Sequence, residues 1–197
     1  MQLVFATNNL NKLKEVQSLI PENIHLLSLA DIGCFEDVPE TQTTIEGNAI
    51  QKAEYIKTHY GYDCFADDTG LEVAALNGEP GVYSARYAGQ QRNADANMDK
   101  LLNALKNHLN REAQFKTVIA LCLNGKLQTF TGICEGKITT SKHGNKGFGY
   151  DPIFKAKGYD KTFAQIPLDE KNKIGHRGKA IQLLVQFLNS NSTTPKL

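Results

Sequence analysis

Two apolar segments joined by a pair of turn-forming residues place the strongest constraint on what this chain can fold into. FKTVIALCL (115–123) and KLQTFTGIC (126–134) flank Asn124 and Gly125. An Asn-Gly pair suits the two positive-φ positions of a type I′ turn, whose twist matches that of antiparallel strands. The sequence therefore predicts a long β-hairpin, so the fold must contain an antiparallel strand pair.

Strand and helix patterns alternate along the rest of the chain. Three more segments read as strands, at residues 2–7, 24–29 and 63–70. Four segments have the apolar spacing of a helix, at residues 13–20, 43–60, 98–109 and 181–188. Thr43 is expected to cap the second of these helices, with Glu46 completing a capping box. Strands interspersed with helices, together with one hairpin, predict an α/β fold with three layers around a mixed sheet.

The composition is that of an ordinary soluble domain. Of 197 residues, 41% are hydrophobic and 22% are charged, and the formal net charge is +1. This balance predicts a single domain over residues 1–190, without a charge field that would attract nucleic acid or a membrane. Residues 191–197 lack apolar periodicity, so a frayed tail is expected there. Without a signal-like N-terminus or a long apolar run, a cytoplasmic location is expected. The four cysteines lack CxxC spacing, so we interpret them as reduced thiols and not as zinc ligands.

ATNNLNK (6–12) joins the first predicted strand to the first predicted helix. Such a join exposes backbone N–H groups at the positive end of the helix dipole, where anions bind well. Lys12 lies one turn into the helix and would oppose the dipole unless an anion sits nearby. The segment indicates either a phosphate-binding loop or an ordinary asparagine cap beside a solvated lysine.

ADDTG (66–70) places two adjacent carboxylates, Asp67 and Asp68, at the end of an apolar strand. Neighbouring strand side chains point to opposite faces, so the two are expected to have different roles. One would brace backbone amides while the other serves as metal ligand or general base, and Asp67→Asn would then be a control for Asp68→Asn. The alternative is an aspartate-rich turn.

KGFGYDP (146–152) brackets Phe148 between two glycines. Glycines let the backbone approach a flat ligand, an aromatic ring can stack on a base, and Tyr150 or Asp151 can hydrogen-bond a base edge. The alternative is that Phe148 belongs to the core.

DEKNKIGHRGKA (169–180) gathers basic residues ahead of the last predicted helix: Lys171, Lys173, His176, Arg177 and Lys179. Taken alone it suits a solvated helix face, yet a His-Arg pair can contact both a phosphate and a base edge. Because all four segments lie at the ends of predicted elements, together they indicate a nucleotide-phosphate site with a divalent metal ion.

Six segments occur in this order: TNNLNK, Glu40-Thr41, ADDTG, PGVYSARYAG, GFGYDPIF and EKNKIGHRGKA. Their order and spacing resemble those of the noncanonical purine nucleoside triphosphate pyrophosphatases, the inosine triphosphate pyrophosphatase family, from residue 3 to about residue 188. The resemblance implies an elongated mixed sheet, two lobes with a central substrate cleft, and a homodimer. It also implies Mg²⁺-dependent hydrolysis of the small molecules ITP, dITP and XTP to the monophosphate and pyrophosphate.

The resemblance assigns roles to individual residues. Asp68 matches the general base, and Glu40 and Asp68 match the ligands of Mg²⁺, for which Mn²⁺ is a possible substitute. Substrate contacts are implied for Thr7, Asn8, Asn9, Leu10, Asn11, Lys12, Thr69, Phe148, Gly149, Tyr150, Asp151, Lys171, His176 and Arg177.

Two other functions are compatible with the same segments. A noncatalytic nucleotide-binding or RNA-associated module would use the same lysines, and a pyrophosphatase for other modified nucleotides would use the same metal site. Glu40 and Asp68 favour an enzyme, because a binder of polyanions gains nothing from carboxylates facing the phosphates unless a metal ion intervenes.

Overall fold

The computed structural model describes residues 1–192, which form two compact units. Unit 1 contains Met1–Asp68, Thr117–Gly132 and the chain from Arg177 onward, and unit 2 contains Thr69–Lys116 and Ile133–His176. A seven-stranded sheet has the order β2-β1-β3-β5-β6-β7, with β4 paired to β3. The predicted α/β class with a mixed sheet is confirmed, and the central cleft stays a prediction.

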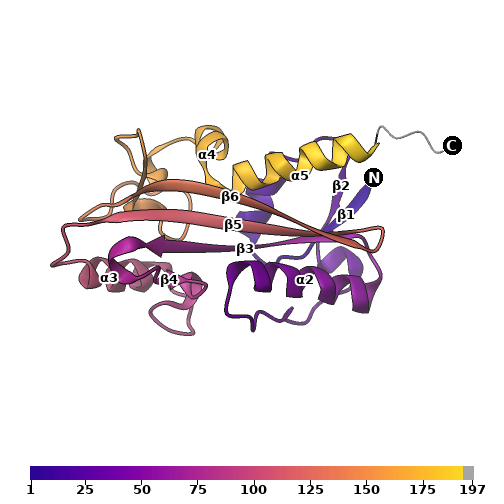
Figure 1. Ribbon diagram of the computed structural model, residues 1–197, viewed down its shortest axis with the longest axis horizontal. Helices are drawn as coiled ribbons and strands as arrows, with labels where there is room; N and C mark the ends of the chain where they lie inside the picture. The colour runs from indigo at the N-terminus through magenta and orange to yellow at the C-terminus, as the bar shows by residue number, and fades with distance from the viewer. Residues whose placement is uncertain (193–197) are drawn as a thin grey trace. The chain divides into compact units, whose positions relative to one another are not determined.

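The strands and α-helices follow one another along the chain as drawn in Figure 1: β1 Gln2–Phe5, α1 Leu10–Gln17, β2 His25–Leu27, α2 Ile45–Tyr60, β3 Cys64–Val73, β4 Pro80–Gly81, α3 Ala94–Ala104, β5 Glu112–Leu123, β6 Lys126–Ile138, β7 Phe154–Ala156, α4 Leu168–Ile174 and α5 His176–Ser192. Short 3₁₀ helices lie at Ala30–Ile32, Ala74–Leu76, Ser84–Arg86, Asp151–Ile153 and Phe163–Gln165.

Parallel strand pairs form one side of unit 1. β1 pairs in parallel with β2, with Val4 opposite Leu27, and in parallel with β3, with Val4 opposite Cys64. Parallel neighbours cannot be joined by a tight turn, so the chain needs a crossover between them. α1 provides the crossover from β1 to β2, and α2 lies between β2 and β3.

Helices cover both faces of the unit 1 strands. On one face, Phe65 shares a hydrophobic cluster with Val16 of α1 and Leu184 of α5. On the other face, the thiol of Cys64 donates to the carbonyl of Ala53 in α2 across 3.1 Å. Figure 1 shows α5 and α2 on opposite sides of these strands. This arrangement confirms the three predicted layers. Because strand residues alternate between faces, successive residues of β3 face α1 and α5 on one side and α2 on the other.

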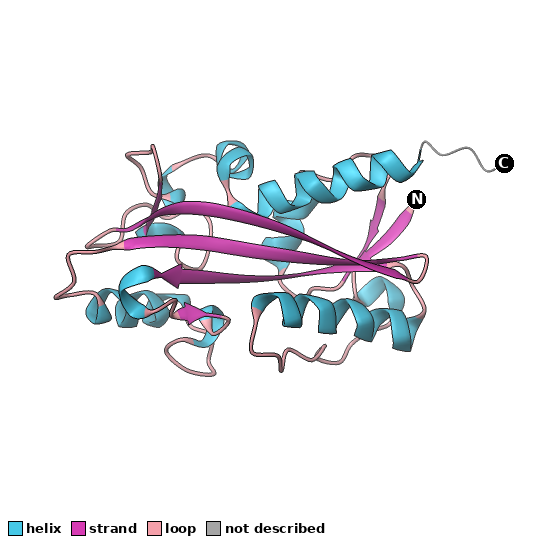
Figure 2. Cartoon of the chain, viewed as in Figure 1, coloured by secondary structure: helices cyan, strands magenta, loops and turns pink. Residues whose placement is uncertain are grey.

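β5 and β6 form the predicted hairpin, drawn as two long arrows in Figure 2. Asn124 has a φ of 49° and Gly125 a φ of 74°, the positive values that a type I′ turn requires. The backbone N–H of Asn124 also donates to the carboxylate of Asp63 across 3.1 Å. The turn is therefore fastened to the residue that precedes β3.

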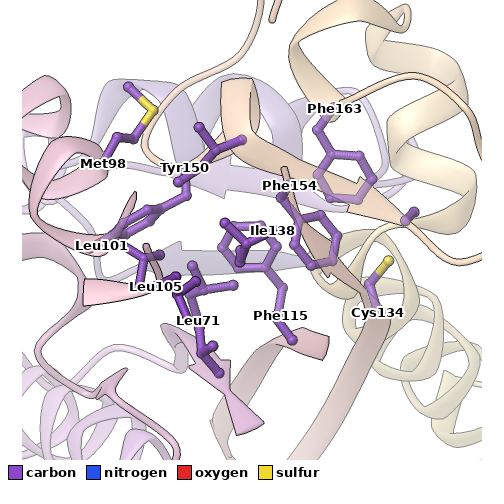
Figure 3. Close-up of a cluster of buried hydrophobic side chains, with 14 of the residues drawn as sticks. Leu71, Met98, Leu101, Leu105, Phe115, Cys134, Ile138, Tyr150, Phe154 and Phe163 are labelled. Atoms are coloured by element: carbon purple, nitrogen blue, oxygen red, sulfur yellow. The ribbon is translucent and has the colours of Figure 1, made fainter. Parts of the chain in front are cut away.

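An aromatic cluster forms the core of unit 2. The ring of Phe154 lies 4.6 Å from that of Phe115 and 5.0 Å from that of Phe163, measured between centroids. Figure 3 shows these rings with side chains from β3, from α3 and the residue that follows it, from β6 and from the 148–151 segment: Leu71, Met98, Leu101, Leu105, Cys134, Ile138 and Tyr150. Tyr150 of the predicted base-binding segment KGFGYDP (146–152) is thus built into the core.

Three boundaries expected from the sequence are wrong. β3 continues to Val73, so Asp67 and Asp68 lie within the strand and not at its end. The N-cap of α2 is Thr44 and not Thr43, because the hydroxyl of Thr44 accepts the N–H of Gly47 at 2.9 Å. α3 ends at Ala104, and the backbone then turns tightly, with the N–H of His108 donating to the carbonyl of Leu105. Leu109 is consequently exposed, although the apolar spacing placed it on the helix.

Three remaining features concern the whole described chain. α5 extends to Ser192, so the frayed tail predicted for 191–197 falls mostly on residues 193–197, which lie outside the described residues. The cysteines, Cys34, Cys64, Cys122 and Cys134, are buried free thiols. Within residues 1–192, no helix combines the length and apolar character needed to cross a membrane.

Candidate functional site

The loop from β1 to α1 contains the asparagine cap that the sequence allowed, and phosphate binding by this loop stays a prediction. Asn9 is the N-cap of α1, and its side-chain oxygen accepts the N–H groups of Asn11 at 3.0 Å and Lys12 at 3.2 Å. The hydroxyl of Thr7 accepts the N–H of Asn9 at 3.2 Å. Asn8, Leu10 and Asn11 are exposed, which leaves this edge of the loop open to solvent. Lys12, however, is not a solvated lysine.

Lys12 reaches back to a residue within β3. Its ammonium group lies 2.9 Å from Oδ1 of Asp67, and only 14% of its side chain is exposed. The other oxygen of Asp67, Oδ2, accepts from Nε and Nη2 of Arg177 at 3.2 and 3.1 Å. Nη1 of Arg177 donates to Glu15 on α1 across 2.5 Å. Asp67 and Glu15 therefore bind the two cations on the face of β3 covered by α1 and α5.

Burial and charge oppose each other in this group. Burial raises the pKa of the Asp67 carboxyl, but Lys12 and Arg177 outweigh burial and hold that pKa well below its usual range. Burial lowers the pKa of the Lys12 ammonium group, with Asp67 acting in the opposite direction. Burial also disfavours the charged form of Arg177, but Asp67 and Glu15 raise its pKa above the ordinary value. The charged forms of Asp67 and Arg177 are therefore favoured, whereas the net effect on Lys12 is a lowered pKa.

Asp68 points to the opposite face, as the strand geometry predicted. Its Oδ2 accepts from the side-chain amide of Asn48 on α2 across 3.2 Å, and the residue is 9% exposed. Lys52, one turn further along α2, donates to the carboxylate of Glu40 at 2.5 Å and to the backbone carbonyl of Asp67 at 2.6 Å. Glu40 is thereby held beside the backbone of the residue that precedes Asp68.

The charges of this group do not cancel. It holds three cations, Lys12, Lys52 and Arg177, and four carboxylates, Glu15, Glu40, Asp67 and Asp68. All of them belong to unit 1. A net negative site of this kind favours a bound cation and disfavours a free polyphosphate.

A second group of predicted residues lies in unit 2 and is organised by the buried carboxylate of Asp151. Its Oδ2 accepts the backbone N–H of Phe148 at 2.8 Å and the ammonium group of Lys171 at 2.6 Å. The same ammonium group lies 4.9 Å from the centroid of the Phe148 ring, within the range of a cation–π contact. Phe148 is half-buried, so the structure holds its ring in place without enclosing it.

Gly147 makes this turn possible. Its φ is 72°, and a Cβ atom at this position would lie 2.0 Å from Oδ2 of Asp151. Gly149 also has a positive φ, of 62°, but a Cβ atom there would meet nothing within 4 Å. Both glycines were predicted to let a ligand approach, but their surroundings differ. Gly147 makes room for the carboxylate of Asp151, whereas the space beside Gly149 is open.

Three other predicted residues of unit 2 have differing environments. The hydroxyl of Tyr150 donates to the carbonyl of Ser84 across 2.9 Å inside the core, and burial raises the pKa of this hydroxyl. The ring of His176 is buried and stacks on that of Phe115, with centroids 4.4 Å apart. Thr69, the first residue of unit 2, is half-buried. The substrate-binding roles of all the predicted residues stay predictions.

Comparison with known proteins identifies the family. The model of the Ham1 family matches residues 3–187. The chain belongs to the Ham1 family. It is 67% identical over 190 residues to a dITP/XTP pyrophosphatase of Flavobacterium johnsoniae, with 96% of this chain and 99% of that protein covered. The family resemblance drawn from the six sequence segments is therefore confirmed.

Solved structures of Ham1 proteins have the same fold. The Staphylococcus aureus Ham1 protein is 43% identical with a TM-score of 0.89, covering 97% of this chain and all of that one. A HAM1 protein from Coxiella burnetii is 37% identical, also with a TM-score of 0.89, covering 96% of this chain and 99% of that one.

Sequence reasoning missed three residues of the unit 1 group: Glu15, Asn48 and Lys52. A signal for two of them exists in α2, where Asn48 and Lys52 lie on the same helical face as the apolar residues Ala49, Ala53 and Ile56. A lysine within an apolar stripe must find a buried partner, and this one finds Glu40. Glu15 carries no comparable signal.

Proposed function

We propose that this protein hydrolyses noncanonical purine nucleoside triphosphates, namely dITP, ITP and XTP, to the monophosphate and pyrophosphate. Relatives named dITP/XTP pyrophosphatase, identical at up to 67% over almost their whole length, support this activity. The observation that carries the proposal is the pair of carboxylates, Glu40 and Asp68, which α2 holds in unit 1 through Lys52 and Asn48 respectively. Removal of such nucleotides would cleanse the nucleotide pool.

We propose that Glu40 and Asp68 hold a Mg²⁺ ion, with Mn²⁺ as a possible substitute. The donor set fits, because both ligands are carboxylates and Mg²⁺ prefers oxygen. No group of three or more His, Cys, Asp or Glu side chains that would hold a metal occurs within residues 1–192, and Mg²⁺ is often bound by one or two carboxylates together with substrate oxygens. When bound, the ion neutralises phosphoryl oxygens and so allows a polyanion to enter a net negative site.

The side chains of the protein itself supply the rest of the chemistry. A water molecule attacks the α-phosphorus, the bond from this phosphorus to the bridging oxygen breaks, and pyrophosphate leaves. Asp68 accepts the proton of the attacking water, and Asn48 keeps its carboxylate oriented. Lys12 and Lys52 balance the charge that develops on the phosphate oxygens.

At the base end, Phe148 stacks on the purine and Lys171 fixes its ring. ITP and XTP carry a carbonyl at position 6 of the purine, where ATP carries an amino group, so a hydrogen-bond donor there selects the former. His176 or the backbone N–H groups of the segment around Phe148 provide that donor, because Arg177 already donates to Asp67 and Glu15. GTP also has the position 6 carbonyl, so its exclusion depends on position 2.

The direct test is to incubate the purified protein and Mg²⁺ with ITP, dITP, XTP, dUTP and ATP and to measure pyrophosphate and orthophosphate separately. Pyrophosphate from the first three nucleotides is expected. Orthophosphate as the primary product would refute the reaction, and preference for dUTP would favour the alternative substrate class. Binding of ITP without any hydrolysis would favour a noncatalytic module.

We propose that the protein works as a homodimer in the cytoplasm, on a small-molecule substrate and without nucleic-acid or membrane partners. The homodimer rests on the family resemblance. The near-neutral net charge of +1 supports the absence of polyanionic partners.

A further inference from the structure

Asp67 is the point at which three helices of unit 1 are tied to β3. Its Oδ1 accepts from Lys12 of α1, and its Oδ2 accepts from Arg177 of α5. Its backbone carbonyl accepts from Lys52 of α2. These contacts range from 2.6 to 3.2 Å. The residue immediately before the proposed general base thus has a cationic partner from each neighbouring helix.

Stability alone does not account for this arrangement. Asp67 is only 1% exposed, and transfer of a carboxylate out of water is strongly unfavourable unless it is paired. Even a well-paired buried group of this kind is often no more stabilising than apolar side chains of the same volume. A buried ionic cluster can instead select one arrangement of its members, and here the selected arrangement directs Lys12 to Asp67, within β3.

Lys12 depends on Asp67 for its charge as well as its orientation. Lys12 is flanked by Asp67 and Asp68 of β3, by Lys52 of α2 and by Arg177 of α5. Burial and the two cations lower the pKa of Lys12, and the two aspartates raise it, with Asp67 the stronger. If the Asp67 carboxylate were lost, burial and two like charges would act on Lys12 with much less opposition.

We infer that Asp67 is a positioning residue for the hydrolysis, which holds Lys12 as an ordered ammonium group against the middle of β3 and acts through Lys12 without touching the substrate. This inference rests on the proposed function. The sequence predicted that Asp67, facing away from Asp68, would not affect the reaction, so that Asp67→Asn could serve as a control for Asp68→Asn. The inference gives Asp67 a role in the reaction instead.

A double-mutant cycle tests whether Asp67 acts through Lys12. Asp67→Asn is expected to lower kcat/KM for ITP by about 10- to 100-fold, the usual effect of removing a group that orients a functional side chain. Lys12→Met should lower it by about 10²- to 10³-fold, as for loss of one charge-stabilising donor. In the Lys12→Met background, Asp67→Asn should cost less than about 3-fold, because its target is already gone. Losses that multiply independently would overturn the inference.

A second measurement does not depend on hydrolysis. Acetic anhydride at pH 8 acetylates neutral amines, and mass spectrometry compares Lys12 with Lys126, an exposed lysine of β6. In Asp67→Asn the ratio of Lys12 to Lys126 acetylation should rise several-fold, since a fall of one unit in the pKa of Lys12 gives about ten times more neutral amine. An unchanged ratio would overturn the inference.

The two arms separate failure of this inference from failure of the proposed function. If the wild-type protein releases no pyrophosphate, the proposed function fails, and the acetylation ratio then decides only whether Asp67 keeps Lys12 charged. If Asp67→Asn does not fold, Asp67→Glu keeps the charge but displaces the carboxylate. This variant should retain the low wild-type acetylation of Lys12 and still lose at least about 10-fold in kcat/KM. Wild-type kcat/KM in Asp67→Glu would refute a positioning role.

Discussion

The side-chain amide of Asn48 donates to Oδ2 of Asp68 across 3.2 Å, and its oxygen accepts the backbone N–H of Gln42 at 2.9 Å. Asn48 thus links the proposed general base to the loop that carries Glu40. Lys52 makes a second link, since it binds Glu40 directly. Both proposed metal ligands are therefore positioned by α2, and they would respond together to a change in this helix.

Replacement of Asp68 by Asn should abolish most turnover while leaving the fold intact. The amide keeps the shape of the side chain but cannot accept the proton of the attacking water. Loss of a general base lowers the rate by about 10²- to 10⁴-fold, and weaker metal binding would add to this. Nucleotide affinity should fall much less, because Lys12 and Lys171 retain their charges. Steady-state kinetics with ITP, together with calorimetric binding, measures both effects.

The control for this variant must be chosen from the structure. Asp67→Asn is unsuitable, because Asp67 is buried against Lys12 and Arg177. Asp160→Asn is suitable, since its side chain is fully exposed and its nearest cation, on Lys155, is 3.9 Å away. Turnover by Asp68→Asn above about a tenth of the wild-type rate would show that Asp68 is not the base.

Removal of the metal ion should stop the reaction. EDTA is expected to abolish pyrophosphate release, and excess Mg²⁺ or Mn²⁺ should restore it, because without a cation the net negative group in unit 1 repels a triphosphate. Full activity in EDTA would contradict the proposed metal site. Glu40→Gln should raise the Mg²⁺ concentration needed for half-maximal activity, which a dose–response curve can measure.

The sequence predicted residue roles better where they depend on local geometry than where they depend on tertiary contacts. Alternation along a strand was enough to predict that Asp67 and Asp68 face opposite ways. The environment of Asp67 was not predictable, because its partners Lys12, Lys52 and Arg177 come from three helices far apart in the chain. The position of Lys52 in an apolar stripe indicates that it is buried, but no sequence pattern names the carboxylate or carbonyl that a lysine will meet.

The same distinction holds for the fold. The Asn124-Gly125 turn requires only two neighbouring residues with positive φ, and it formed where the sequence placed it. The end of α3 depends on which leucine still reaches the core, and Leu105 does while Leu109 does not. Two adjacent threonines are equally good caps in sequence, so only the bond from Thr44 to the Gly47 N–H decides between them.

Truncation of Phe148 should weaken substrate binding more than catalysis. Stacking on a base is made in the ground state and the transition state alike, and it is worth about 1 to 3 kcal/mol, or about 5- to 150-fold. Phe148→Ala should therefore raise the KM for ITP by a factor in this range with a smaller change in kcat. Phe35→Ala is the control, because that ring is 82% exposed. An unchanged KM would return Phe148 to a purely structural role.

Sedimentation at micromolar concentration should give the mass of a dimer. This expectation derives from the family resemblance alone, so a monomer at every concentration would count against the dimer and not against the reaction.

Gly147→Ala should damage the site more than an equivalent change at another glycine of unit 2. Gly147 and Gly158 both have positive φ, of 72° and 83°, so alanine is strained at either position by roughly 1 to 2 kcal/mol. A Cβ atom at Gly158 meets nothing within 4 Å, whereas one at Gly147 would lie 2.0 Å from Oδ2 of Asp151. Gly158→Ala therefore measures the backbone strain alone.

The difference between the two variants reports on the buried carboxylate. In Gly147→Ala the oxygen must move, and it is the same oxygen that accepts from the N–H of Phe148 and the ammonium group of Lys171. Overpacking of this kind adds about 1 to 3 kcal/mol to the loss of stability, so denaturant unfolding should show a larger loss for Gly147→Ala than for Gly158→Ala. The KM for ITP should rise only in Gly147→Ala, because only there is the Phe148 ring released from its support. Equal KM values in the two variants would mean that Asp151 does not position the stacking ring.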